Sequence, residues 1–209
     1  MRPYKTIHIE AKTERVINRS RFISQCFPVK TEEEALLRLS EVKKQYPDAT
    51  HVCYAYRIGE NSETTRFSDA GEPSGTAGMP ILEVLKAKGL TYVLCTVTRY
   101  FGGILLGAGG LVRAYSSGAA DASAAAGADM HLPGVLIKMK CDYSRYGAIG
   151  SLMAKSNASI IDTQFTDEVQ LSVSAAKEDA DAIIKAVIER TDGRCKPDIA
   201  GECELVIPC

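Results

Sequence analysis

Residues 67–117 read FSDAGEPSGTAGMPILEVLKAKGLTYVLCTVTRYFGGILLGAGGLVRAYSS, and two glycine clusters divide this stretch. The first cluster, GEPSGTAG, spans 71–78, and the second, FGGILLGAGG, spans 101–110. Each cluster runs into a segment with the apolar spacing of a helix. Because glycine costs chain entropy, such clusters are expected where the backbone turns sharply or approaches another group closely. A glycine loop that opens a helix also presents unpaired N–H groups, the usual geometry of an anion site.

Strands and helices on both sides of this stretch predict a first domain over residues 1–130. The segment TYVLCTVTRYF (91–101) is apolar and β-branched, which is typical of a central strand. Thr31 is expected to cap a helix that carries glutamates in its first turn and lysines in its last. Further strands are expected at 14–20, 21–29 and 51–59, and helices at 31–46, at 77–88 and from the second cluster to about 126.

A second domain is expected over residues 134–209, after a linker at MHLPG (130–134). Its strands are expected at 134–142, 158–165, 168–176 and 202–209, and its helices at 143–157, with Ser144 as a cap, and at 177–193. The resulting order is β-α-β-β-α-β, which is the ferredoxin-like split unit. The fold class is therefore predicted as α+β, with two domains.

Composition and charge exclude several classes of protein. The longest apolar runs are too short and too rich in glycine to span a bilayer, and the N-terminal segment has no secretory signal. Seven cysteines without a C-x-x-C pair indicate a reduced, cytoplasmic setting. Residues 1–133 carry a net charge of +2 and residues 134–209 a net charge of −3. Neither half has the basic excess of a protein that grips nucleic acid through phosphates, so any such contact needs a local patch.

The first glycine cluster predicts an anion-binding cradle at the start of a helix. N–H groups, hydroxyls and the positive end of the helix axis would converge there. The equally weighted alternative is a long turn in which the two carboxylates only cap the backbone. The candidate residues are Arg66, Asp69, Glu72, Ser74, Gly75 and Thr76.

The second cluster adds an arginine, an aromatic pair and glycines that allow close approach. Such a group suits stacking on a base and holding a phosphate. In the alternative, Arg99 pairs with a carboxylate such as Asp69 or Glu72 and locks the two loops together. The candidate residues are Arg99, Tyr100, Gly102, Gly103, Gly107, Gly109, Gly110 and Arg113.

No pattern in the sequence identifies a catalytic, cofactor or metal site. The stretch has neither G-K-[ST] nor G-x-G-x-x-G after a strand, which disfavours the familiar nucleotide sites. The strongest enzyme hypothesis brings His51 and Asp69 to Ser74, although Ser74 lacks a nucleophile elbow. The three histidines are scattered without metal-ligand spacing.

The motifs DAGEPSGTAG (69–78) and VTRYFGGILLGAGGLVRAY (97–115) resemble the YigZ/IMPACT family. The resemblance covers about residues 1–127, and the remainder resembles the small C-terminal domain of bacterial YigZ-type members. It implies a first domain with the fold of ribosomal protein S5 domain 2 and a second similar to domain V of elongation factor G. Eukaryotic relatives regulate translation by competing for an activator of a stress kinase, with the help of an additional N-terminal domain.

Three functions follow as hypotheses. The leading one is a non-enzymatic protein of the translation apparatus that docks RNA, the ribosome or a translation factor through the two glycine loops. The second is a small hydrolase-like enzyme acting on a phosphorylated or carboxylated metabolite. The third is a protein–protein adaptor. No cofactor and no membrane contact are expected.

Overall fold

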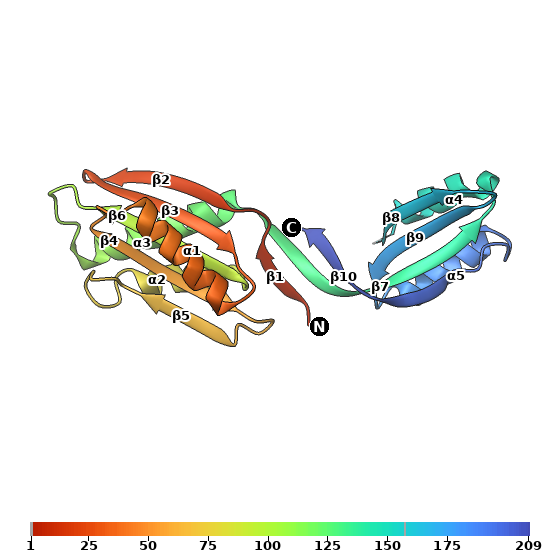
Figure 1. The fold of residues 1–209 in the computed structure, drawn as a ribbon, viewed down its shortest axis with the longest axis horizontal. Coiled ribbons are helices and arrows are strands. Elements are labelled where there is room, and N and C mark those ends of the chain that lie inside the picture. Colours follow the sequence, from red (N-terminus) through yellow and green to blue (C-terminus); the bar gives the residue numbers. More distant parts are fainter. Residues whose placement is uncertain (1, 157) are drawn as a thin grey trace. The chain divides into compact units, whose positions relative to one another are not determined.

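The computed structural model describes residues 2–156 and 158–209 of the chain. Residues 1 and 157, which begin the predicted first domain and end a predicted helix, lie outside the described residues. The elements follow one another as β1(Tyr4–Ile7), β2(Ala11–Ile17), β3(Ser20–Pro28), α1(Glu32–Gln45), β4(His51–Ile58), β5(Thr64–Ser68), α2(Gly78–Ala87), β6(Val93–Tyr100), α3(Gly107–Ala125), β7(Ala128–Cys141), α4(Tyr143–Met153), β8(Ala158–Phe165), β9(Val169–Ala176), α5(Ala180–Arg190) and β10(Asp198–Pro208) (Figure 1).

The chain divides into two compact units, each with its own core. The N-terminal unit comprises residues 4–130 with 208–209, and the C-terminal unit comprises residues 131–207 with the described residues before Tyr4. Both units mix helices with antiparallel strands, so the α+β class is confirmed. No helix among the described residues has the length and hydropathy needed to cross a membrane.

The N-terminal unit is built on an antiparallel sheet in the order β2-β3-β6-β4-β5. The apolar strand β6 lies at its centre, as its composition predicts, between β3 and β4. Alternate residues of β6 serve two cores: Leu94 packs with α1, whereas Val93, Cys95 and Val97 pack with α2 and α3. Figure 1 shows α1 lying in front of this sheet. The sheet is therefore covered by helices on both faces.

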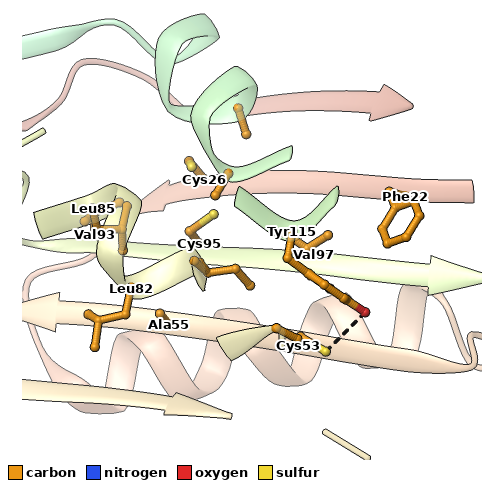
Figure 2. Close-up of a cluster of buried hydrophobic side chains, with 14 of the residues drawn as sticks. Phe22, Cys26, Cys53, Ala55, Leu82, Leu85, Val93, Cys95, Val97 and Tyr115 are labelled. Atoms are coloured by element: carbon orange, nitrogen blue, oxygen red, sulfur yellow. Dashed lines mark hydrogen bonds between the residues drawn. The ribbon is translucent and has the colours of Figure 1, made fainter. Parts of the chain in front are cut away.

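The core beneath α2 and α3 contains small and sulfur-bearing side chains. Cys26 and Cys95 lie opposite each other on β3 and β6, and both are fully buried (Figure 2). Cys53 on β4 is also fully buried. The alanines of α3 allow the helix to approach the sheet, and Ala119 and Ala122 are fully buried against it.

The C-terminal unit shows the predicted β-α-β-β-α-β order, formed by β7, α4, β8, β9, α5 and β10. β7 pairs with β9 and β9 with β8, both antiparallel, and β10 pairs with β7. Its core joins the inward residues of β7 and β9 to residues of α4 and α5. Both helices therefore cover the same face of this sheet.

Several local predictions need correction. The predicted linker at 130–134 is instead part of β7, a continuous strand that runs through Pro133. Helix α4 begins at Tyr143 with Asp142 as its N-cap residue, so Ser144 lies inside the first turn. The short strands β1 and β5 were not predicted, because neither has a clear alternation of apolar and polar residues. Thr31 does cap α1, since its hydroxyl accepts a hydrogen bond from the Glu34 amide at 3.2 Å.

Candidate functional site

The candidate site begins where β6 ends, at Arg99. The register places Phe22 of β3 and His51 of β4 on either side of Arg99. Arg99 follows Val97 by two residues, so it faces the side of the sheet that α2 and α3 cover. There the guanidinium lies 5.4 Å from the ring centroids of both Phe22 and Phe101. The sheet thus holds a buried cation beside two aromatic rings.

Glu72 of the first glycine cluster neutralises this buried arginine. The Arg99 Nη1 donates to Glu72 Oε1 at 2.7 Å, and the Tyr115 hydroxyl donates to the same oxygen at 2.7 Å. The side chains of Arg99 and Glu72 are only 6% and 3% exposed. A buried ion pair is tolerated when further hydrogen bonds satisfy its charges, and Tyr115 supplies one. The pairing alternative for Arg99 is therefore confirmed, with Glu72 as its partner.

The network continues from Tyr115 to Cys53 (Figure 2). The Cys53 thiol lies 3.4 Å from the Tyr115 hydroxyl and donates to the Asp69 carbonyl at 2.9 Å. Burial raises the pKa of Cys53 to about 12, and burial also raises the pKa of Tyr115 well above its ordinary value. Both groups therefore remain protonated at neutral pH. Cys53 does not supply a thiolate, and Tyr115 acts as a fixed donor.

Asp69 occupies the donors that were predicted to form the anion cradle. Its carboxylate accepts the backbone N–H groups of Gly75, Ala77 and Gly78 at 2.8–2.9 Å. Burial alone would raise the pKa of Asp69, but these three N–H groups outweigh it and lower the pKa. The start of α2 is thus capped by a carboxylate of the same loop. Thr76 is also satisfied internally, since its hydroxyl donates to the Pro73 carbonyl at 2.7 Å.

Gly78 and Gly102 are required by close backbone approach. A Cβ on Gly78 would lie 2.7 Å from the Ser68 backbone, and one on Gly102 would lie 2.0 Å from the Arg19 backbone. Ser20 fastens the second contact, because its hydroxyl accepts from the Gly102 N–H at 3.1 Å and lies 3.4 Å from Arg99 Nη2. The base of the second loop is therefore locked to the turn between β2 and β3.

The rest of the second loop projects into solvent. Its tip residues Ile104 and Leu105 are 41% and 84% exposed, and Phe101 is exposed beside Arg99. Gly103 and Gly107 adopt positive φ angles of 83° and 69°, which favour glycine. Arg113 of α3 lines a hollow of about 320 Å³ with Leu106, Gly110 and residues of the β2–β3 turn. Gly109 is exposed in the first turn of α3.

Two predicted site residues lie on the other face of the sheet. Tyr100 follows Arg99 directly and points the opposite way, where its hydroxyl donates to Asp48 at 3.0 Å. Arg66 on β5 is 63% exposed and lies 4.0 Å from Glu32 at the start of α1. Neither belongs to the Arg99–Glu72 network. Tyr100 and Phe101 were expected on the same surface as Arg99. Phe101 does lie beside Arg99, whereas Tyr100 lies on the opposite face of the sheet.

The Ser74, His51 and Asp69 arrangement does not form as a catalytic triad. Ser74 is exposed and makes no hydrogen bond with any described residue. The His51 Nδ1 lies 2.9 Å from the Ala70 carbonyl, and its Nε2 faces Glu72 Oε2 at 3.9 Å. Over residues 2–156 and 158–209, no group of His, Cys, Asp and Glu side chains is arranged to hold a metal ion.

Sequence reasoning missed Tyr115, Cys53 and Ser20 as members of the network. In the sequence, Tyr115 falls in the apolar spacing of a helix and Cys53 in a half-buried strand, and neither pattern points to a polar contact. One signal could have identified Tyr115: a buried tyrosine needs a partner for its hydroxyl, and Tyr115 lies on the packed face of an alanine-rich helix. Nothing in the local sequence marks Ser20, whose role depends on the approach of Gly102.

Comparisons with known proteins agree with this division of the chain. Residues 18–123 match the Impact N-terminal domain, and residues 139–194 match a domain of unknown function (DUF1949). The IMPACT family member YvyE of Bacillus subtilis is 37% identical over 191 residues, which cover 91% of this chain and 88% of that protein. The IMPACT family member YigZ of Escherichia coli is 36% identical over 160 residues, covering 76% and 78%.

Two further matches show how far the similarity extends. The human protein IMPACT is 34% identical over 92 residues, which are 43% of this chain and 29% of that protein. A solved structure described as that of a hypothetical protein has 30% sequence identity and a TM-score of 0.62. The match covers 94% of this chain and 97% of the solved one. Both units therefore have a counterpart of known structure.

Proposed function

Because the chain belongs to the IMPACT family and carries both domains of its YigZ-type members, we propose that it is a translation-associated binding protein. Its docking surface is the exposed part of the second glycine loop, Phe101–Gly110, with Arg113 beside it. We also propose that the two units share the folds of ribosomal protein S5 domain 2 and of elongation factor G domain V, as the family resemblance implies. The cellular setting in this proposal is the cytoplasm.

The observation that carries the proposal is that the second glycine loop has an exposed apolar tip and a base fixed by hydrogen bonds. Leu105 is 84% exposed, and Ile104 and Phe101, in the same loop, are exposed too. Their exposure is unfavourable, because transfer of a large apolar side chain out of water lowers the free energy. Exposed apolar residues that gather in one patch are typical of an interaction site, whereas single exposed ones are common on any protein surface. The base beneath them is fixed by Gly102 and Arg99, so little loop entropy is lost when a partner binds.

The polar groups below the loop favour binding over catalysis. Glu72 is held by Arg99 and Tyr115, and Asp69 is held by backbone N–H groups, so neither carboxylate is available as a base. Their hydrogen bonds stabilise the two loops instead. The exposed aliphatic tip suits a protein surface, such as that of a ribosome-associated factor. Arg113, which makes no ion pair with a described residue, adds a contact for an acidic group or an RNA phosphate.

A loop variant tests the proposal directly. Replacing Ile104→Ser and Leu105→Ser removes the apolar tip while the base contacts remain. We expect co-sedimentation with ribosomes from a cytoplasmic extract, measured at low salt, to fall at least tenfold. Leu36→Ser with Leu37→Ser is a matched control, because both leucines are exposed on α1.

Three results would contradict the docking surface. They are undiminished co-sedimentation of the loop variant, an equal loss in the α1 control, and no co-sedimentation of the wild-type protein. A thermal-shift screen against phosphorylated metabolites addresses the enzyme alternative. A strong stabilisation that Ser74→Ala abolishes would favour an enzyme, since ligand binding raises stability according to affinity.

A further inference from the structure

The C-terminal unit has one sheet face that its helices leave open. Along β7, Val135, Ile137 and Met139 are buried against α4 and α5, so the alternate residues Lys138 and Lys140 point away from the helices. The pairing of β7, β9 and β8 extends these positions into rows across the sheet. The rows are Lys138–Ser172–Asp162 and Lys140–Gln170–Gln164.

Cations gather over this face although the unit as a whole is acidic. Residues 134–209 carry a net charge of −3. A hollow of about 560 Å³ on the open face is nevertheless lined by four cations and only two acids. The cations are Lys138, Lys140, Arg194 and Lys196, and the acids are Asp162 and Glu168. All four cations are exposed, and none forms an ion pair or hydrogen bond with a described side chain.

Two of these cations are held in place by the residue between them. Cys195 is fully buried in the core, and its N–H donates to the buried Thr191 hydroxyl at 3.2 Å. Arg194 and Lys196 therefore point outward from a fixed segment. Their position does not depend on pairing with an acid, so their charge is available to a ligand.

The neutral groups in the hollow indicate what kind of anion fits. Gln164, Gln170 and Ser172 line the same hollow as the cations and can bond to phosphate or sugar oxygens. No aromatic side chain lines the hollow, so base stacking is not available there. Lys138 and Lys140 are separated by two residues of an extended strand, about 6–7 Å. Successive phosphates along an extended single strand have a comparable separation.

We propose that this open face binds the phosphodiester backbone of a single-stranded nucleic acid without reading its sequence. A cationic groove that tracks the backbone is the electrostatic half of such a site. The face lies in the C-terminal unit, whereas the proposed docking loop lies in the N-terminal unit. Substitutions in one therefore leave the other intact, and the two proposals can fail separately.

The test is binding of the full chain to labelled oligouridylate and oligothymidylate, measured by fluorescence anisotropy over a range of salt concentrations. We expect Lys138→Glu with Lys140→Glu to weaken binding at least tenfold. Because each phosphate contact on a single strand contributes about 0.7 to the slope of log K against log salt, the slope should fall by about 1.4. Both lysines are exposed and unpaired, so the thermal midpoint should stay unchanged.

The matched control is Lys155→Glu with Lys185→Glu, which makes the same charge change at exposed positions outside the hollow. It should bind as the wild type does, and the loop variant Ile104→Ser with Leu105→Ser should too. Equal weakening in the lysine control would overturn the proposal, as would the absence of binding at low salt. Preference for anionic lipid vesicles over oligonucleotides would assign the face to a membrane surface instead.

Discussion

At the scale of single residues, the candidate site rests on one buried carboxylate. Glu72 Oε1 accepts hydrogen bonds from both Arg99 and Tyr115. These bonds connect the first glycine loop to β6 and α3. The sequence offered a carboxylate partner for Arg99 only as the alternative to a bound phosphate or base. It did not indicate Tyr115, whose polar atom is hidden within an apolar helical pattern.

Removing Glu72 should therefore destabilise the protein strongly. In Glu72→Ala the Arg99 charge stays buried without its partner, which typically costs about 3–5 kcal/mol. Tyr115→Phe removes only one donor to a charged group and should cost about 1.5–3 kcal/mol. Urea unfolding of each variant measures these losses. Glu83→Ala, at an exposed pair with Lys86, serves as control and should change stability by less than about 1 kcal/mol.

At the scale of elements, the start of α2 depends on Asp69 rather than on its own N-cap residue. Ala77 offers no side-chain cap, and the Asp69 carboxylate reaches Gly75, Ala77 and Gly78 from the end of β5. The sequence left two alternatives open for this loop, a cradle for a foreign anion or a self-capped turn. For these three donors the structure shows the self-capped turn.

Asp69 should make stability depend on pH. Its folded-state pKa is lowered, so the ionised form contributes stability above the unfolded-state pKa of about 3.9. That contribution is lost as the pH falls through the folded-state value. Wild type should exceed Asp69→Asn in unfolding free energy at pH 7, and the difference should shrink below about pH 4. A difference that is constant from pH 7 to pH 3 would contradict this role. Asp167→Asn, which makes the same chemical change at an exposed position, is the matched control for the substitution.

Most elements were predictable because their side chains alternate or repeat with a clear period. α1 is an example, with its own cap, whereas β6 was predictable from its largely apolar, β-branched composition. The predicted linker failed for a non-local reason: MHLPG carries turn-forming residues, yet pairing partners extend β7 through them. β5 was missed because TTRFS is a short edge strand with no buried residue. The site contacts of Ser20 and Gly102 likewise depend on segments far apart in sequence.

At the scale of the whole molecule, two separate cores predict two cooperative units of unfolding. Leu85 lies in a core of the N-terminal unit and Ile137 in that of the C-terminal unit, and both are fully buried. Leu85→Ala and Ile137→Ala should each cost about 2–5 kcal/mol. Scanning calorimetry should show each variant lowering the transition of its own unit only. A single transition that both variants shift equally would show that the units unfold together.

The close contact between Gly102 and the Arg19 backbone fixes the base of the second loop and leaves its tip exposed. Any side chain at Gly102 would collide with the Arg19 backbone, whereas the side chains of Ile104 and Leu105 are 41% and 84% exposed. The tip residues can therefore be substituted without disturbing the contacts at the base of the loop. Substitutions at Ile104 and Leu105, in related chains or in laboratory libraries, should therefore change the exposed surface of the loop with little effect on the free energy of folding.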